Sequence, residues 1–109
     1  MATATFTGAS GQTYSFSLFT EVGFNNISRQ SAVVIIASGT NSEPKVILIA
    51  APHNIKHDII DSGVWADAVR NHDANMLYIH FDINGTNNSR QKHVDDLTRY
   101  YDPPMKRCE

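Results

Sequence analysis

The chain has 109 residues, of which 41% are hydrophobic and 18% are charged, and its formal net charge is −2. This length fits one domain of about 100–150 residues, and the ordinary composition excludes a disordered or low-complexity protein. The nine Lys and Arg residues are scattered along the chain, which disfavours general nucleic-acid binding, because that activity draws on a surplus of basic residues.

Neither a signal peptide nor a membrane span is expected. The first residues lack a charged segment followed by an apolar one. The longest apolar runs, residues 32–37 and 46–52, are far shorter than a membrane-spanning helix. We therefore expect a cytoplasmic protein without a membrane partner.

The N-terminal third predicts an antiparallel hairpin. Residues 4–7 are an expected short strand, and residues 8–11 (GASG) are rich in the amino acids that favour turns. Tyr14, Phe16 and Leu18 then alternate with polar residues. That period of two predicts a strand with one face in solvent.

Three further strands are expected in the core of the domain. Residues 31–38 and 45–50 are continuous runs of apolar, largely β-branched residues, which is typical of strands buried on both faces. A turn cluster at residues 39–44 joins them. Residues 76–81 predict the third strand of this group.

Two short helices are expected between the second and third core strands. Asn54 is a suitable cap for a helix that runs to about residue 60. A second helix is expected over residues 64–72, with Val64, Trp65, Ala68 and Val69 toward the core.

A third and longer helix is expected to begin at residue 88 or 89 and to end at Tyr101. Its apolar residues Val94, Leu97 and Tyr101 follow the spacing of a helix packed on a sheet. Pro103 and Pro104 follow it, and proline cannot continue a helix.

Together these elements predict one α+β domain. It consists of a small mixed or antiparallel sheet with a three-stranded core, flanked by three helices and preceded by an N-terminal hairpin. We expect residues 1–26 to form the hairpin extension and residues 31–104 to form the core.

Three groups of residues occur in the order and spacing of a known family. They are Phe6-Thr7-Gly8-x-Ser10-Gly11-x-x-Tyr14-x-Phe16; then Asn54, Trp65, Asn71-His72-Asp73-Ala74-Asn75 and His80; and finally Asp96-Leu97, Tyr101 and Asp102-Pro103-Pro104. In this order they resemble the GIY-YIG nuclease domain, and in particular its small bacterial members with an added N-terminal hairpin. The resemblance spans nearly the whole chain and implies a central three-stranded sheet.

The resemblance also implies phosphodiester hydrolysis at one divalent metal, assisted by two strand tyrosines, a helix arginine and a metal-binding glutamate. The two tyrosine positions are occupied by Val34 and Leu48, and a glycine of the second motif is replaced by Ala50. The arginine position is Asp58 and the glutamate position is Val94. Neither aliphatic side chains nor a misplaced negative charge can perform these roles, so we expect no catalytic residues and no cofactor.

A register shifted by one residue places His57 at the arginine position and Asp95 at the glutamate position, but it restores neither tyrosine. The expected residual cleft contains Asn54, His57 and His80. We expect His80 to be a partly buried residue with one hydrogen bond.

Two other groups of polar residues have the residue types of a possible site. His53 and His57 have the spacing of a zinc-binding pair but lack a third ligand in the sequence, so we expect them to lie on a solvent-exposed helix face. Asp95 and Asp96 point in different directions on a helix, and Asp96 is expected to pair with Arg99 or Lys92.

The sequence therefore favours a non-catalytic interaction module whose partner is another protein or a second copy of the chain. Two alternatives remain. One is a metal-dependent hydrolase or nuclease with relocated residues, such as His53, His57 and His80. The other is a nucleic-acid-binding module that does not cleave its ligand.

Overall fold

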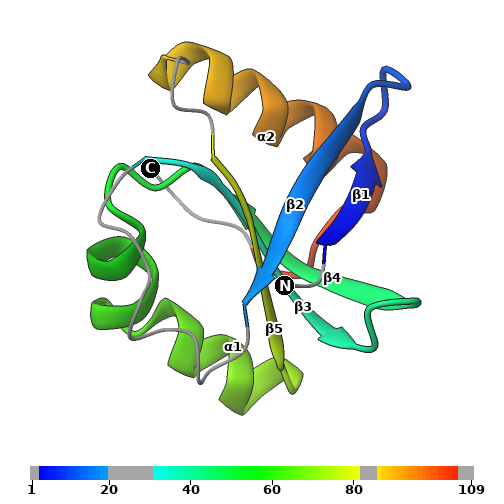
Figure 1. Ribbon diagram of the computed structural model, residues 1–109. Helices are drawn as coiled ribbons and strands as arrows, with labels where there is room; N and C mark the ends of the chain where they lie inside the picture. Colours follow the sequence, from blue (N-terminus) through cyan, green and yellow to red (C-terminus); the bar gives the residue numbers. More distant parts are fainter. Residues whose placement is uncertain (1–2, 20–30, 82–85, 106–109) are drawn as a thin grey trace.

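The structure is a computed structural model that describes residues 3–19, 31–81 and 86–105. Its centre is a five-stranded antiparallel sheet with the strand order β1-β2-β5-β3-β4 (Figure 1). The expected α+β class is therefore confirmed. The elements are β1 (Thr3–Thr7), β2 (Thr13–Phe19), β3 (Val33–Gly39), β4 (Pro44–Ala50), η2 (Lys56–Asp61), α1 (Val64–His72), β5 (Met76–His80) and α2 (Asn87–Tyr101).

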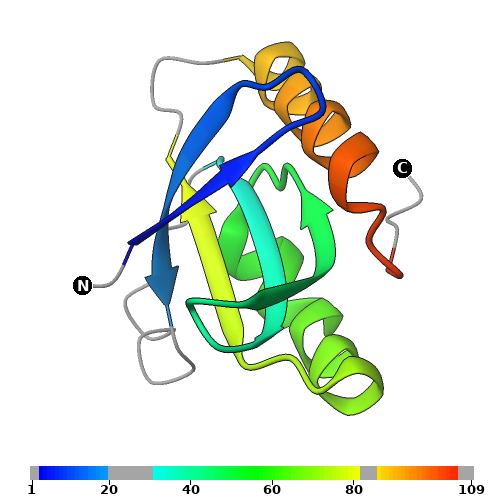
Figure 2. The same cartoon turned by 90° about the vertical axis from the view of Figure 1, so that its right-hand side faces the viewer.

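Helices cover both faces of the sheet. The helices η2 and α1 pack on one face, here named the α1 face, and α2 packs on the other, here named the α2 face (Figures 1 and 2). Strand β3 shows the division: Val34 and Ile36 lie in the core of the α1 face, whereas Val33 and Ile35 lie in the core of the α2 face. Its apolar run is continuous because both faces are buried, as expected.

The N-terminal hairpin is an integral part of the sheet. Strand β2 pairs with β5, with Ser17 opposite Ile79, so β5 lies between the hairpin and β3. The hairpin also supplies aromatic side chains to the α2 face. The ring of Phe6 lies 5.2 Å from that of Phe16 and 4.9 Å from that of Tyr78, in edge-to-face contacts. Residues 20–30, which include the end of the expected hairpin extension, lie outside the described ranges.

Each edge strand receives a hydrogen bond from a segment outside the sheet. In β4, Ile47 is an extra residue, because Leu48 pairs with Ile36 while Val46 pairs with Ala37. This bulge places Ile47 and Leu48 in the same core, and the Ile47 carbonyl accepts a hydrogen bond of 3.0 Å from the backbone N–H of Met105. At the other edge, Asn41 Nδ2 donates to the Thr3 carbonyl at 3.4 Å.

The first two helices follow the expected bounds closely. The cap residue of η2 is Ile55 and not the expected Asn54, although the Asn54 side chain accepts a hydrogen bond of 3.1 Å from the backbone N–H of His57. The next helix, α1, covers the expected residues and buries Trp65 and Ala68. Val69, however, is 40% exposed, so its expected place in the core is wrong, because the buried stripe of this short helix is narrow.

The last helix begins slightly earlier than expected. Thr86 is its cap, and α2 itself starts at Asn87. The Thr86 hydroxyl accepts from the Ser89 N–H at 3.1 Å, and the Ser89 hydroxyl accepts from the Thr86 N–H at 3.0 Å. This reciprocal capping box satisfies donors at the helix start. Within the described ranges, no helix combines the length and apolar character needed to cross a membrane.

Candidate functional site

The positions of the strand motifs in the family resemblance lie together in the core of the α1 face. Val34 and Leu48 are 0% and 1% exposed, and Ala50 belongs to the same cluster. Ile55 and Ile59, at and within η2, cover this cluster. The two tyrosine positions are thus adjacent, but the surface that they would form is a packed aliphatic core.

The two helix positions of the resemblance do not complete that site. The Asp58 carboxylate accepts hydrogen bonds from the backbone N–H groups of His53 at 3.1 Å and Asn54 at 3.3 Å, so it holds the start of η2. Val94 is buried in the α2 face, on the opposite side of the sheet from Val34. The four positions therefore do not converge on one concave surface.

The histidine candidates are also separated. His57 is exposed on η2, as expected, whereas His53 is exposed but precedes the helix, so the two do not share a helix face. The ring of His80 lies on the α2 face, beside Tyr14 and Phe16, and its Nδ1 is 2.8 Å from the Ser15 carbonyl oxygen, which confirms the single hydrogen bond expected. Among the described residues, no three His, Cys, Asp or Glu side chains could hold a metal ion together.

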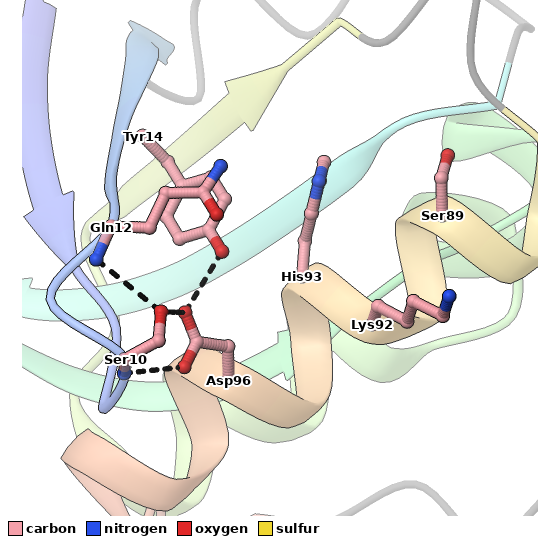
Figure 3. Close-up of a pocket in the computed structure, with 7 residues that line it drawn as sticks. All are labelled: Ser10, Gln12, Tyr14, Ser89, Lys92, His93 and Asp96. Carbon is pink, nitrogen blue, oxygen red and sulfur yellow. Dashed lines mark hydrogen bonds between the residues drawn. The ribbon is translucent and has the colours of Figure 1, made fainter.

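Polar side chains instead gather between the β1–β2 turn and α2, in a hollow that we name the hairpin–α2 cleft. Its volume is about 300 Å³. Figure 3 shows the turn and β2 on one side and successive turns of α2 on the other. The lining residues are Ser10, Gln12, Tyr14, Ser89, Lys92, His93 and Asp96.

Asp96 joins the two walls of the cleft. Its carboxylate accepts hydrogen bonds from the Ser10 N–H at 2.8 Å, the Ser10 hydroxyl at 2.7 Å and the Tyr14 hydroxyl at 2.9 Å. The expectation that Asp96 pairs with Arg99 or Lys92 is therefore wrong, because the turn supplies closer donors; Arg99 contributes electrostatic attraction alone. The hydrogen bonds from Ser10, followed by the one from Tyr14, lower the pKa of Asp96 below its ordinary value.

Gly8 permits this close approach of the hairpin to α2. A Cβ atom on Gly8 would lie 2.1 Å from Asp96 Oδ2, well inside contact distance. The backbone N–H of Ala9 also donates to the Asp96 carbonyl at 3.0 Å. The GASG turn therefore contacts Asp96 of α2 in addition to closing the hairpin.

Tyr14 is a hydrogen-bond donor in the cleft. Burial, together with the hydrogen bond to Asp96 and the negative charge of that residue, raises the pKa of Tyr14 to about 12. A hydroxyl that stays protonated up to this pH cannot serve as a proton acceptor near neutrality. Tyr14 therefore lacks the property that a tyrosine needs to activate water.

Two imidazoles lie beside Tyr14, and one of them, His93, lines the cleft. The His93 ring centroid is 4.9 Å from that of Tyr14 and 5.9 Å from that of His80. His93 Nδ1 is buried and has no hydrogen-bond partner, which is rare and costly for a buried polar atom. His93 is therefore the polar group of this cluster whose hydrogen-bonding capacity is unused.

Sequence reasoning missed this cleft, although part of its signal was visible. Ser89, Lys92, His93 and Asp96 have the i, i+3, i+4, i+7 spacing of one helix face. That polar stripe was overlooked because the apolar stripe of the same helix was used to orient it. The partnership with Ser10 and Tyr14 could not be read from spacing, because more than 80 residues separate these residues from Asp96.

Comparison with known proteins found no matching family model, no matching curated protein and no matching solved structure. The GIY-YIG resemblance therefore remains a prediction from the residues quoted above.

Proposed function

We propose that this chain is a non-catalytic binding module that contacts a protein partner through the hairpin–α2 cleft. The observation that carries the proposal is that cleft itself, in which Gln12, Lys92 and His93 line a hollow between the hairpin and α2. The positions at which a nuclease would need its tyrosines and its metal-binding residue lie elsewhere: Val34 and Leu48 are buried on the α1 face, whereas Val94 is buried on the α2 face. These three side chains are aliphatic and can neither bind a metal ion nor activate water.

The chemistry of the cleft supports recognition better than catalysis. Tyr14 is held as a neutral donor to Asp96, and Asp96 is already bonded to three donor groups. A general base must be free to take a proton from the substrate. The exposed side chains of Gln12 and Lys92, together with His93, can instead contact a bound group.

The edges of the sheet are less suitable for a partner. The Thr3 carbonyl at the β1 edge and the Ile47 carbonyl at the β4 edge already accept hydrogen bonds from within the chain. A strand added to either edge would have to replace these contacts. The cleft requires no such replacement.

The location of the partner is tested by photo-crosslinking in the cells that produce the protein. A photoreactive amino acid at Gln12, in the cleft, is expected to give one discrete adduct. The same amino acid at Val69, which is exposed on α1, is the matched control and is expected to give none. No adduct at Gln12, or the same adduct at both positions, would refute this location.

The absence of catalysis is tested with the purified chain. Single- and double-stranded DNA and RNA, incubated with Mg²⁺ or Mn²⁺, are expected to remain intact. Cleavage that is lost in the His57→Ala or Asp58→Ala variant would overturn the proposal in favour of a nuclease with relocated residues. Binding that weakens steeply with salt, without cleavage, would instead favour the nucleic-acid-binding alternative.

A further inference from the structure

We propose that the hairpin–α2 cleft binds a single carboxylate group, as presented by a Glu or Asp side chain of the partner, with Lys92 and His93 as its donors. This inference rests on the proposed function and assigns a chemical class to the group that the cleft receives. The two charged side chains that line the cleft, Asp96 and Lys92, differ in the partners that they have within the chain, and this difference carries the inference.

The negatively charged side chain in the cleft already has hydrogen-bond partners. The three hydrogen bonds from Ser10 and Tyr14 occupy the Asp96 carboxylate, and they hold it ionised by favouring its charged form. Asp96 thus keeps its negative charge, but its oxygens have little remaining capacity to accept hydrogen bonds from a ligand.

The positively charged side chain of the cleft, Lys92, differs from Asp96 in this respect. Lys92 is exposed, and the ion pairs between described residues, Lys56 with Asp61 and Arg70 with Asp67, do not involve it. An ammonium group can donate three hydrogen bonds. An anionic oxygen in the cleft would therefore meet a donor whose charge is available.

His93 provides the second donor. Its Nδ1 is buried without a partner, and an acceptor oxygen in the cleft would supply one after a rotation of the ring. The titratable groups around the ring are Tyr14 from β2, His80 from β5, and Lys92 and Asp96 from α2 itself. The orphaned Nδ1 atom of His93 is therefore the second group in the cleft that can bond to a carboxylate oxygen.

The Asp96 charge favours a carboxylate ligand over a phosphate. The cleft, with a volume of about 300 Å³, has room for one acidic side chain. The Asp96 carboxylate lines the same cavity as Lys92, and its repulsion is stronger for a doubly charged phosphate than for a singly charged carboxylate.

The test is an NMR titration of the whole chain with an acetylated and amidated peptide, Ala-Ala-Glu-Ala-Ala, at pH 6. The same peptide with Gln in place of Glu is the matched uncharged ligand. We expect saturable shifts of the Ser10, Gln12 and His93 amide signals with the Glu peptide alone. Sulfate, which carries two negative charges at pH 6, is expected to bind more weakly than the Glu peptide.

Variants identify the donors. Lys92→Ala is expected to weaken binding at least about tenfold, as is usual for the loss of a charged hydrogen bond. Lys45→Ala removes the same charge from an exposed site on β4 and should leave binding unchanged. His93→Ala should weaken binding by removing the second donor, whereas His80→Ala, outside the lining of the cleft, should leave binding unchanged.

Several results would overturn this inference. They are equal shifts with the Glu and Gln peptides, tighter binding of sulfate than of the Glu peptide, or full affinity in Lys92→Ala. If the peptide fails to bind while the Gln12 crosslink to a partner is still formed, the carboxylate is wrong and the binding module remains. If the crosslink is absent, the proposed function itself has failed.

Discussion

The two faces of the sheet differ in the side chains that fill them. The core of the α1 face is mainly aliphatic, with Val34, Leu48 and Ile59 at its centre. The core of the α2 face contains aromatic rings in edge-to-face contact, and it ends in the polar hairpin–α2 cleft. The α1 face is thus closed by aliphatic packing, whereas polar side chains line a hollow at the end of the α2 face.

The largest expected effect concerns the aromatic packing of the α2 face. Phe6 is 2% exposed and contacts the rings of Phe16, Tyr78 and Tyr101. Phe6→Ala is expected to lower the free energy of unfolding by about 3–5 kcal/mol, measured by urea denaturation. Ile59→Val, on the α1 face, is the control and should cost about 0.5–1.5 kcal/mol. Similar small losses in both variants would show that the aromatic cluster does not hold the hairpin.

A smaller effect is expected where the hairpin meets α2. Gly8→Ala places a Cβ atom against the Asp96 carboxylate and should destabilise the fold by about 1–3 kcal/mol through overpacking. The cost should be smaller in an Asp96→Ala background, because the clash is then removed. The original chain, the two single variants and the double variant are compared by thermal or urea unfolding. An equal cost in both backgrounds would mean that Gly8 is required by the turn and not by Asp96.

The smallest effect at neutral pH concerns the charge of Asp96, and it appears in acid. The pKa of Asp96 is lower in the folded chain than in the unfolded chain, so its stabilisation is complete above about pH 4 and is lost as the pH falls through the folded-state value. Asp96→Asn should therefore flatten the decline in stability below about pH 4. Asp95→Asn, at the neighbouring exposed position, is the control. An unchanged acid limb in Asp96→Asn would contradict the bonding described for Ser10 and Tyr14.

Much of the secondary structure could be predicted because local patterns carry it. The alternation of Tyr14, Phe16 and Leu18 predicted a strand with one buried face, and the continuous run that includes Val34 predicted a strand buried on both faces. The helix at residues 64–72 was predicted with its observed bounds. These features depend on the side-chain period of each element, which is visible within a few residues.

The candidate site could not be predicted in the same way. The resemblance directed attention to Val34, Leu48, Asp58 and Val94, and spacing alone does not reveal that Val94 lies across the sheet from the others. Val94 would lie on the same face as Val34 if α2 packed on the α1 face instead. That placement is set by packing between residues distant in the chain.

The sequence by itself determined the fold class and most bounds of the strands and helices within residues 3–19, 31–81 and 86–105. The tertiary structure alone decided that α2 packs opposite η2 and α1, that the GASG turn closes on Asp96, and that His93 lies beside Tyr14 and His80. The physical reason is that secondary structure follows from neighbours in the chain, whereas the cleft forms from residues that folding brings together over more than 80 positions.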